Sequence, residues 1–385
     1  MYSKENSIIL NPTENIPMNF ANDYSLLEGL YISDDIRNRD SKIIFAGRNN
    51  YTEVINKYKT DWCKHLKCND IDFRFLSGLH AHIITFMSIG NIGDTILLLP
   101  ESAGGHFSTQ SILKRLGYNV ILAVPDNDNF CVDIDKTLEL IDDHKPRFAF
   151  IDRSEGLYYE DFSWLQNADI PYKIFDGSQY ITQILSGYYP SPFDWGFNIL
   201  LSSTHKNFPG PQKAFLATMN KDEYWEKIKF GSSTYISNSH PKDLMNIVSS
   251  IDRIEDIKQY SDLLLDISYS LEKELLKRGF PIIPKNADKL PTQHLWVRFN
   301  SKEECFSVFS DLEKVGILVN YRLLPYELGY GLRIGVGAAI QQGLRLCDVE
   351  ILADIIFKCY RGSSNNLANE IKDFMKHINP NGKLL

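Results

Sequence analysis

The chain has 385 residues, of which 43% are hydrophobic and 23% are charged, and its formal net charge is -8 at pH 7. This composition excludes wholesale disorder, collagen-like repeats and low-complexity architecture, and the acidic balance argues against a nucleic-acid partner, because phosphate binding draws on clustered Lys and Arg. No stretch approaches the roughly 18 consecutive apolar residues of a membrane-spanning helix, and the N-terminus lacks an apolar signal core. We therefore expect a cytoplasmic protein that contacts no membrane.

Helical and strand patterns alternate up to about residue 240. Apolar spacing predicts helices at 49–66, 80–89, Thr109–Leu116 and Ile134–Asp142. Short apolar runs predict strands at Ile96–Leu99, Asn119–Val124, Phe148–Ile151, Tyr172–Phe175 and Asn198–Leu201. Because strands that alternate with helices need crossover connections, this order predicts a mostly parallel sheet with helices on both faces.

The pattern changes near residue 245. A long amphipathic stretch covers 242–278, and the rest predicts strands at Pro281–Pro284, His294–Phe299 and Leu332–Val336, a helix at Lys302–Val315 and terminal helices over 347–377. We therefore divide the chain into an N-terminal arm (1–48), a large α/β domain (49–245) and a smaller C-terminal α+β domain (246–385).

The cysteines predict neither a disulfide framework nor a metal site. Six cysteines in 385 residues are too sparse for a disulfide-stabilised fold. Cys63, His65 and Cys68 lie close together in the sequence, but no second pair of ligands completes a zinc site.

Two polar strand ends carry the chemistry. Asp176 ends one predicted strand, and Lys206 follows the next strand after Ser203 and His205. In a parallel sheet, ligands sit beyond the carboxyl ends of the strands, so we expect Asp176 and Lys206 to converge. Pyridoxal phosphate requires such a pair, since a lysine binds its aldehyde covalently as an aldimine and an acid keeps its pyridine nitrogen protonated. Alone, Lys206 would be interpreted as a surface charge and Asp176 as a turn or helix cap before Gly177.

The surrounding motifs resemble those of the serine hydroxymethyltransferases, which are pyridoxal phosphate enzymes of fold type I. Residues 202–212 (SSTHKNFPGPQ) resemble the family signature T-T-T-H-K-T-L-x-G-P-x, and 176–179 (DGSQ) are similar to D-x-A-H. The resemblance continues in order from Leu10 to about Gly343. It implies a large domain with a mostly parallel, seven-stranded-type sheet between helices, a smaller C-terminal domain, and a homodimer with shared active sites.

The resemblance also implies the cofactor site. Ala103–Phe107 resembles H-G-G-H-L, whose second histidine stacks on the cofactor ring; this residue is His106, which we group with Lys206 and Asp176 as catalytic. A structural or capping role is the alternative for His106. Further cofactor contacts are expected from a Ser-Gly pair that precedes a helix and could bind phosphate, and from polar residues near the ring: Ser77, Gly78, Ser154, Gln179, Ser203 and His205.

Substrate contacts are implied by two more motifs. Gly331–Gly335 is similar to S-G-[IL]-R-[LIV]-G, in which the arginine, here Arg333, holds the amino-acid carboxylate. An arginine in an apolar strand is costly to bury unpaired, which favours a ligand or a fixed partner. Asn11–Asn15 resembles L-x-x-S-E-N, with Thr13 in place of a serine that touches the same carboxylate, and Tyr31 matches a tyrosine that reaches the phosphate of a neighbouring subunit.

The departures from the family cluster at the folate positions. Arg322 replaces an asparagine that pairs with the pterin, Glu101 stands where an apolar residue would pack, and Gln179 replaces a histidine. The glutamate of hydroxymethyl transfer has no secure equivalent, and only Asp34 or Asp35 could serve in its place. We therefore predict a folate-independent relative that acts on glycine, serine or threonine, with an aldehyde as partner, by aldol or transaldolase chemistry.

Three alternatives remain. Folate-dependent hydroxymethyl transfer is possible if Arg322 and Glu101 form a pair that leaves the pterin slot open. An aminotransferase, decarboxylase or racemase would use the same lysine. A cofactor-binding scaffold without catalysis is disfavoured because Lys206, Asp176 and Arg333 are all retained.

Overall fold

A seven-stranded sheet forms the centre of the larger part of the structure, in the order β2-β10-β9-β8-β7-β3-β4. The computed structural model describes residues 6–18, 23–31, 46, 49–362 and 366–380. Neighbouring strands are parallel, except that β10 is antiparallel to both β9 and β2. The strands are β2 (Asp70–Asp72), β3 (Thr95–Leu98), β4 (Asn119–Leu122), β7 (Phe148–Ile151), β8 (Tyr172–Asp176), β9 (Ile199–Ser203) and β10 (Ala214–Thr218).

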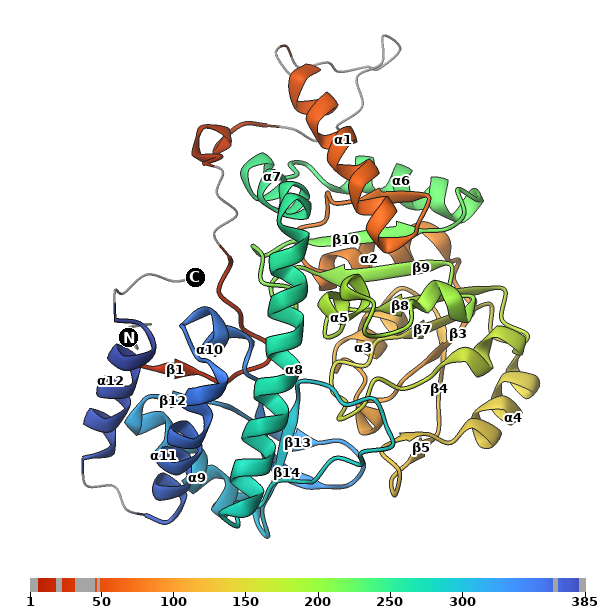
Figure 1. Cartoon of the computed structure of the whole chain (residues 1–385). Coiled ribbons are helices and arrows are strands. Elements are labelled where there is room, and N and C mark those ends of the chain that lie inside the picture. Colours follow the sequence, from red (N-terminus) through yellow and green to blue (C-terminus); the bar gives the residue numbers. More distant parts are fainter. Residues whose placement is uncertain (1–5, 19–22, 32–45, 47–48, 363–365, 381–385) are drawn as a thin grey trace.

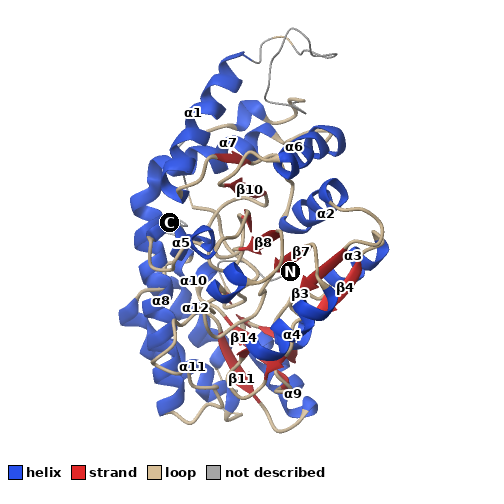
Figure 2. Cartoon of the chain, turned by 90° about the vertical axis from the view of Figure 1, so that its right-hand side faces the viewer, coloured by secondary structure: helices blue, strands red, loops and turns tan. Residues whose placement is uncertain are grey.

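Helices cover both faces of this sheet (Figure 2). Phe148 and Ile174 pack into one core with residues of α2 and α6, whereas their neighbours Ala149 and Phe175 pack into the other with residues of α1 and α7. This alternation is expected, because successive side chains of a strand point to opposite faces. The helices are α1 (Asn49–Leu66), α2 (Gly78–Ile89), α3 (Thr109–Arg115), α4 (Ile134–His144), α5 (Ile181–Ser186), α6 (Glu223–Tyr235) and α7 (Pro241–Ser249).

A smaller C-terminal unit lies across the long helix α8 (Ile254–Lys277) from the sheet (Figure 1). Its antiparallel sheet has the order β11-β14-β13. The N-terminal segment belongs to this unit, because β1 (Ile8–Ile9) pairs with β12 (Ile317–Leu318). The remaining elements are β11 (Leu295–Arg298), β13 (Asn320–Leu324), β14 (Gly329–Ile334), α9 (Lys302–Val315), α10 (Gly337–Gln341), α11 (Val349–Tyr360), α12 (Leu367–Ile378) and a hairpin of β5 (Pro125–Asp126) and β6 (Cys131–Val132).

Within the described ranges, six short 3-10 helices connect these elements, and no helix there has the length and apolarity needed to cross a bilayer. They are η1 (Ser25–Leu27), η2 (Glu101–Ala103), η3 (Ser163–Asn167), η4 (Pro192–Trp195), η5 (Ser250–Arg253) and η6 (Leu346–Asp348).

Two sequence-based expectations for the C-terminal half need correction. The amphipathic stretch 242–278 is not continuous, because η5 separates α7 from α8. The strand predicted at Pro281–Pro284 is wrong: this segment forms only an isolated bridge between Ile282 and Val297. Prolines stand at both of its ends and lack the N–H groups that a continuous ladder needs.

The apolar cores divide the structure within α8. Ile257 belongs to the core of the larger unit, and Tyr260 belongs to that of the smaller one, together with Ile8 and Leu10. The division into 1–48, 49–245 and 246–385 stays a proposal, and much of 1–48 lies outside the described residues.

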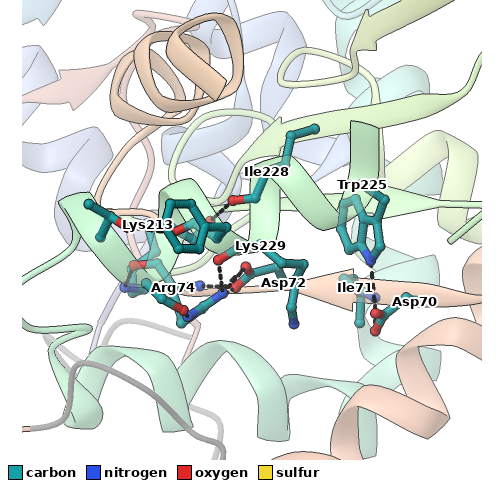
Figure 3. Close-up of polar contacts among 12 residues, drawn as sticks. Asp70, Ile71, Asp72, Arg74, Lys213, Trp225, Ile228 and Lys229 are labelled. Atoms are coloured by element: carbon teal, nitrogen blue, oxygen red, sulfur yellow. Dashed lines mark hydrogen bonds and ion pairs between the residues drawn. The ribbon is translucent and has the colours of Figure 1, made fainter. Parts of the chain in front are cut away.

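A buried ion pair ties the edge strand β2 to α6 (Figure 3). Arg74 Nη2 lies 2.8 Å from Asp72 Oδ2, and the two side chains are 2% and 0% exposed. Arg74 also donates to Ser233 Oγ at 2.8 Å and to the carbonyl of Lys229 at 3.4 Å. Nearby, Lys213 Nζ donates to the Arg74 carbonyl, and burial lowers the pKa of Lys213 to about 7.

Candidate active site

Lys206 lies in a loop that follows β9 and is fastened from two directions. Asn207 Oδ1 accepts hydrogen bonds from the Thr182 backbone N–H and hydroxyl, both at 2.8 Å, and its Nδ2 donates to Gln183 Oε1 at 2.9 Å. On the other side, Asn15 Nδ2 donates to the carbonyl oxygen of Lys206 at 2.7 Å. The lysine backbone is therefore held by both α5 and the N-terminal segment.

One pocket unites residues from both units of the structure. Lys206 faces it together with five other residues for which the sequence predicts a role: Thr13, His106, Ser154, Gln179 and Arg333. Glu155 and Arg322 also line it. Burial lowers the pKa of Lys206, the negative charge of Asp176 opposes this shift, and the positive charge of Arg333 adds to it. A lysine with a lowered pKa is more often in the neutral form that attacks a carbonyl carbon.

Asp176 ends β8 and is paired with a histidine. Its Oδ2 lies 2.8 Å from Nε2 of His82, which is buried on α2, and its Oδ1 accepts from the backbone N–H of Ser178 at 2.8 Å. Burial by itself raises the pKa of Asp176, but the hydrogen bond and charge of His82, together with Lys206, outweigh burial and lower this pKa to about 2. Asp176 is therefore an anion at neutral pH.

The start of α2 lies against the end of β9. Ser77 caps the helix, since its Oγ accepts from the His80 backbone N–H at 3.2 Å. Gly78 follows, and a Cβ atom at this position would lie 3.3 Å from Ser203 Cβ and 3.8 Å from Ser178 Oγ. The absence of a side chain at Gly78 thus lets the first turn of the helix approach the two serines closely.

Two buried polar atoms at and just after the end of β9, Ser203 Oγ and His205 Nδ1, have no hydrogen-bond partner among the described residues, and Ser203 is the one that lies against Gly78. Buried polar atoms are nearly always hydrogen-bonded, so each indicates a missing group. Burial, followed by the charge of Lys206, lowers the pKa of His205 to about 4. Hydroxyl groups beside a helix N-terminus suit an anionic group such as a phosphate.

His106 is positioned by two glycines. Gly104 has φ +83°, and a Cβ there would lie 2.0 Å from the Glu155 carbonyl oxygen, so no other residue fits without a shift. Gly105 pairs with Arg153 across an isolated bridge. His106 Nδ1 lies 2.8 Å from Ser108 Oγ, and burial, aided by the charges of His82 and Lys206, lowers the pKa of His106 to about 4.

Two arginines on adjacent strands share one carboxylate. Arg333 on β14 and Arg322 on β13 both contact Glu155 Oε1, the former at 3.5 Å. Burial lowers the pKa of Arg333 to about 10. Its Nε has no partner among the described residues, and its hydrogen bond to the Ser154 carbonyl is long, at 3.4 Å. Arg333 therefore keeps unused donors that fit a carboxylate ligand.

Other predicted residues occupy more ordinary positions. The Thr13 hydroxyl donates to Asn11 Oδ1 at 2.8 Å. Gln179 Oε1 lies 3.2 Å from His294 Nε2. Tyr31 is 41% exposed and lies apart from the pocket lining, with its hydroxyl 3.4 Å from Ser237 Oγ.

Sequence reasoning missed His82, Glu155 and Asp152. Asp152 follows β7 and accepts from the Thr109 hydroxyl at 2.7 Å, and burial, aided by the charge of Asp176, raises its pKa well above the usual value. His82 lies within a helix that the sequence predicts. Its partner, Asp176, is far away in the chain, so no local sequence pattern indicates the pair. Asp34 and Asp35 lie outside the described residues.

Comparison with known proteins identifies relatives. A serine hydroxymethyltransferase from Saccharolobus islandicus (strain M.14.25 / Kamchatka #1) is 26% identical over 372 residues, which cover 92% of this chain and 86% of that protein. A fluorothreonine transaldolase from Streptantibioticus cattleyicolor is 26% identical over 308 residues, which cover 79% of this chain and 48% of that protein. The chain is homologous to the serine hydroxymethyltransferases. No protein-family model matches it.

The fold has a solved counterpart. The crystal structure of L-threonine transaldolase from Pseudomonas fluorescens, in its internal aldimine state, matches with a TM-score of 0.89 at 19% identity and covers 97% of this chain and 88% of that one. The predicted serine hydroxymethyltransferase resemblance and the fold type I architecture are therefore both confirmed.

Proposed function

We propose that this chain is a pyridoxal phosphate-dependent enzyme of the serine hydroxymethyltransferase type that makes or breaks a carbon–carbon bond of a small amino acid. Its relatives are hydroxymethyltransferases and transaldolases, which confirms the expected class of cofactor and of aldol-type chemistry. The single observation that carries the proposal is that Lys206 and Arg333 line one pocket, and that Asp176 ends the strand next to the one that the lysine loop follows.

The residues present fit the cofactor. Ser203 Oγ is buried without a hydrogen-bond partner among the described residues and lies against the Ser77–Gly78 helix start, which suits a phosphate, and His205 Nδ1 close by in the chain is also buried and unpartnered among those residues. Asp176 is anionic and suits a protonated pyridine nitrogen, although His82 already holds one of its oxygens. When bound, the cofactor supplies an electron sink for the bonds of the substrate α-carbon. His106, Ser154 and Gln179 complete its proposed surroundings.

The chain itself would bind and orient the amino acid. Arg333 offers unused donors in a buried setting, and we propose that they hold the substrate carboxylate with Thr13 beside them. Charge-assisted hydrogen bonds contribute about 1.5–3 kcal/mol each, so the site favours substrates that carry a carboxylate. Glycine, serine or threonine, with an aldehyde as partner, are the substrates we propose.

The pair of Arg322 and Glu101 bears on whether the reaction uses folate. Arg322 Nη2 lies 3.6 Å from Glu101 Oε1, so these two residues do form an ion pair. Such a pair is the condition under which the pterin slot could stay open. This observation favours folate-dependent hydroxymethyl transfer as the second candidate. Against it, the Arg322 guanidinium also reaches into the pocket and contacts Glu155. We propose the folate-independent reaction, in a cytoplasmic homodimer whose Tyr31 reaches the partner's site.

The function is tested with protein loaded with pyridoxal phosphate. Addition of glycine should change the visible absorption band, and serine or threonine should release an aldehyde. Reduction with borohydride followed by peptide mapping should place the label on Lys206, whereas Lys213, a second buried lysine with a pKa lowered to about 7, should stay unlabelled. Lys206→Ala should lower kcat by more than about 100-fold.

Two outcomes would contradict this proposal. A label at another lysine, or a spectrum that no amino acid alters, would remove the assignment of Lys206 and of the reaction. A large, saturable increase in serine cleavage on addition of tetrahydrofolate would replace the folate-independent reaction by the second candidate.

A further inference from the structure

Glu155 is a buried carboxylate in the pocket with one oxygen unused. The side chain is 2% exposed, and Oε1 contacts both Arg322 and Arg333. Oε2 is buried and has no hydrogen-bond partner among the described residues. A buried carboxylate oxygen without a donor is costly, so a donor is expected there when the site is occupied.

The backbone fixes where this carboxylate lies. The Glu155 N–H donates to the Gly104 carbonyl at 3.0 Å, and Gly104 approaches so closely that a Cβ there would lie 2.0 Å from the Glu155 carbonyl oxygen. His106 follows this glycine pair and lines the same pocket. Glu155 is therefore held in a defined position relative to His106.

The described pocket lining offers few other proton acceptors. Glu155 is its only carboxylate. His106 has a pKa lowered to about 4, and its Nδ1 already lies 2.8 Å from Ser108 Oγ. The remaining polar groups are hydroxyls, an amide, two guanidiniums and the lysine itself.

We propose that Glu155 is a catalytic residue that accepts the proton of the hydroxyl group on the substrate β-carbon. The proposal rests on the function proposed above. In cleavage, the hydroxyl O–H bond breaks and its proton passes to Glu155 Oε2, while the O–H electron pair forms the carbonyl bond of the released aldehyde. The Cα–Cβ bond breaks, and its electron pair remains on the α-carbon. In the reverse direction, Glu155 returns the proton to the new hydroxyl group.

Arg322 acts in this scheme as a positioning residue. Its contact with Oε1 leaves Oε2 for the substrate. Arg333 is shared between Glu155 and the proposed substrate carboxylate, so the bound substrate neutralises one of the two cations beside Glu155.

The test compares a reaction that needs a hydroxyl group with one that does not. In full-length protein loaded with pyridoxal phosphate, Glu155→Gln should slow the cleavage of serine or threonine by about 100- to 10,000-fold. Exchange of the glycine α-proton with deuterium, followed by NMR, should stay within about threefold of the wild-type rate. Glycine has no hydroxyl group, so this exchange also shows that the variant is folded and binds cofactor.

The matched control is Glu101→Gln. Glu101 also faces Arg322, at 3.6 Å, but is 57% exposed and is not part of the pocket lining. Its cleavage rate should remain within about twofold of wild type. Equal losses of cleavage and glycine exchange in Glu155→Gln would overturn the assignment in favour of a purely structural role, and unchanged cleavage would overturn it outright. If the wild-type protein shows neither reaction, it is the proposed function that fails.

Discussion

At the scale of single residues, the state of Asp176 depends on His82. Burial and hydrogen bonding act on this carboxylate in opposite directions, and the His82 contact at 2.8 Å decides the outcome. Because the folded-state pKa, about 2, lies below the ordinary value of 3.8, Asp176 stabilises the fold above about pH 4. This contribution is lost as the pH falls through the folded-state pKa.

His82→Phe should therefore destabilise the apoprotein in a pH-dependent way. Removal of the histidine leaves a buried carboxylate short of its partner, and we expect a loss of about 3 kcal/mol in the free energy of unfolding at pH 7. The difference from wild type should shrink between pH 5 and pH 2, where Asp176 takes up a proton. Urea unfolding at several pH values measures this. Ser88→Ala, on the same helix, should show a small loss that does not change with pH.

The site residues at the ends of strands are the ones that the sequence predicts best. Asp176 ends one buried strand and Lys206 follows the next, and because these strands are parallel neighbours, their carboxyl ends lie together. His82 and Glu155 differ, because each acquires its role from partners far along the chain. A histidine within a helix and a glutamate after a strand are common, and neither carries a pattern that predicts such a partner.

At the scale of elements, the edge strand β2 is held by polar contacts as well as by its ladder. Arg74 and Asp72 are both buried and form an ion pair (Figure 3). Arg74 also donates to Ser233 and so extends the connection to α6. Arg74→Met should lower the free energy of unfolding by about 3–5 kcal/mol, because it leaves the Asp72 charge buried without its partner. Urea unfolding measures the loss.

The double variant Asp72→Leu with Arg74→Met provides the comparison for this prediction. A buried ion pair contributes little net stability when an apolar pair replaces it, so the double variant should recover most of the loss. The exposed pair Lys64–Asp61 supplies the control, and Lys64→Ala should cost less than about 1 kcal/mol. A double variant as unstable as Arg74→Met would contradict this account.

Elements were predictable where their periodicity was local and strong. α1, β7 and α9 have the predicted bounds. The two strands at the antiparallel edge of the large sheet, β2 and β10, were not predicted. β2 is only three residues long. β10 comes directly after the lysine loop, whose residues were interpreted as part of the cofactor motif and not as the approach to a strand. The segment at Pro281–Pro284 is apolar like a strand, yet its prolines leave it only a single bridge to β11.

At the scale of the whole molecule, the N-terminal segment connects the two units at the active site. β1 joins the C-terminal unit by pairing with β12, and the side chains of Ile8 and of Leu10, which follows β1, pack into that core. A few residues later, Asn15 donates to the Lys206 carbonyl at 2.7 Å and to the Tyr260 hydroxyl at 2.9 Å. Asn15 thus links the lysine loop to the long helix that both units share.

Asn15→Ala should therefore weaken both the fold and the hold on the cofactor. The lost side chain leaves the Lys206 carbonyl without this donor, which should cost about 1–3 kcal/mol in the free energy of unfolding. Because Asn15 Nδ2 also donates to the Tyr260 hydroxyl, a double-mutant cycle with Tyr260→Phe should show coupling between the two positions.

Pyridoxal phosphate should dissociate faster from the Asn15→Ala variant, and the absorbance of the cofactor follows its release. Asn11→Ala, at a part-exposed position that bonds only within its own turn, should leave cofactor release unchanged. If both variants release the cofactor at the wild-type rate, the link from the N-terminal segment to Lys206 serves stability alone.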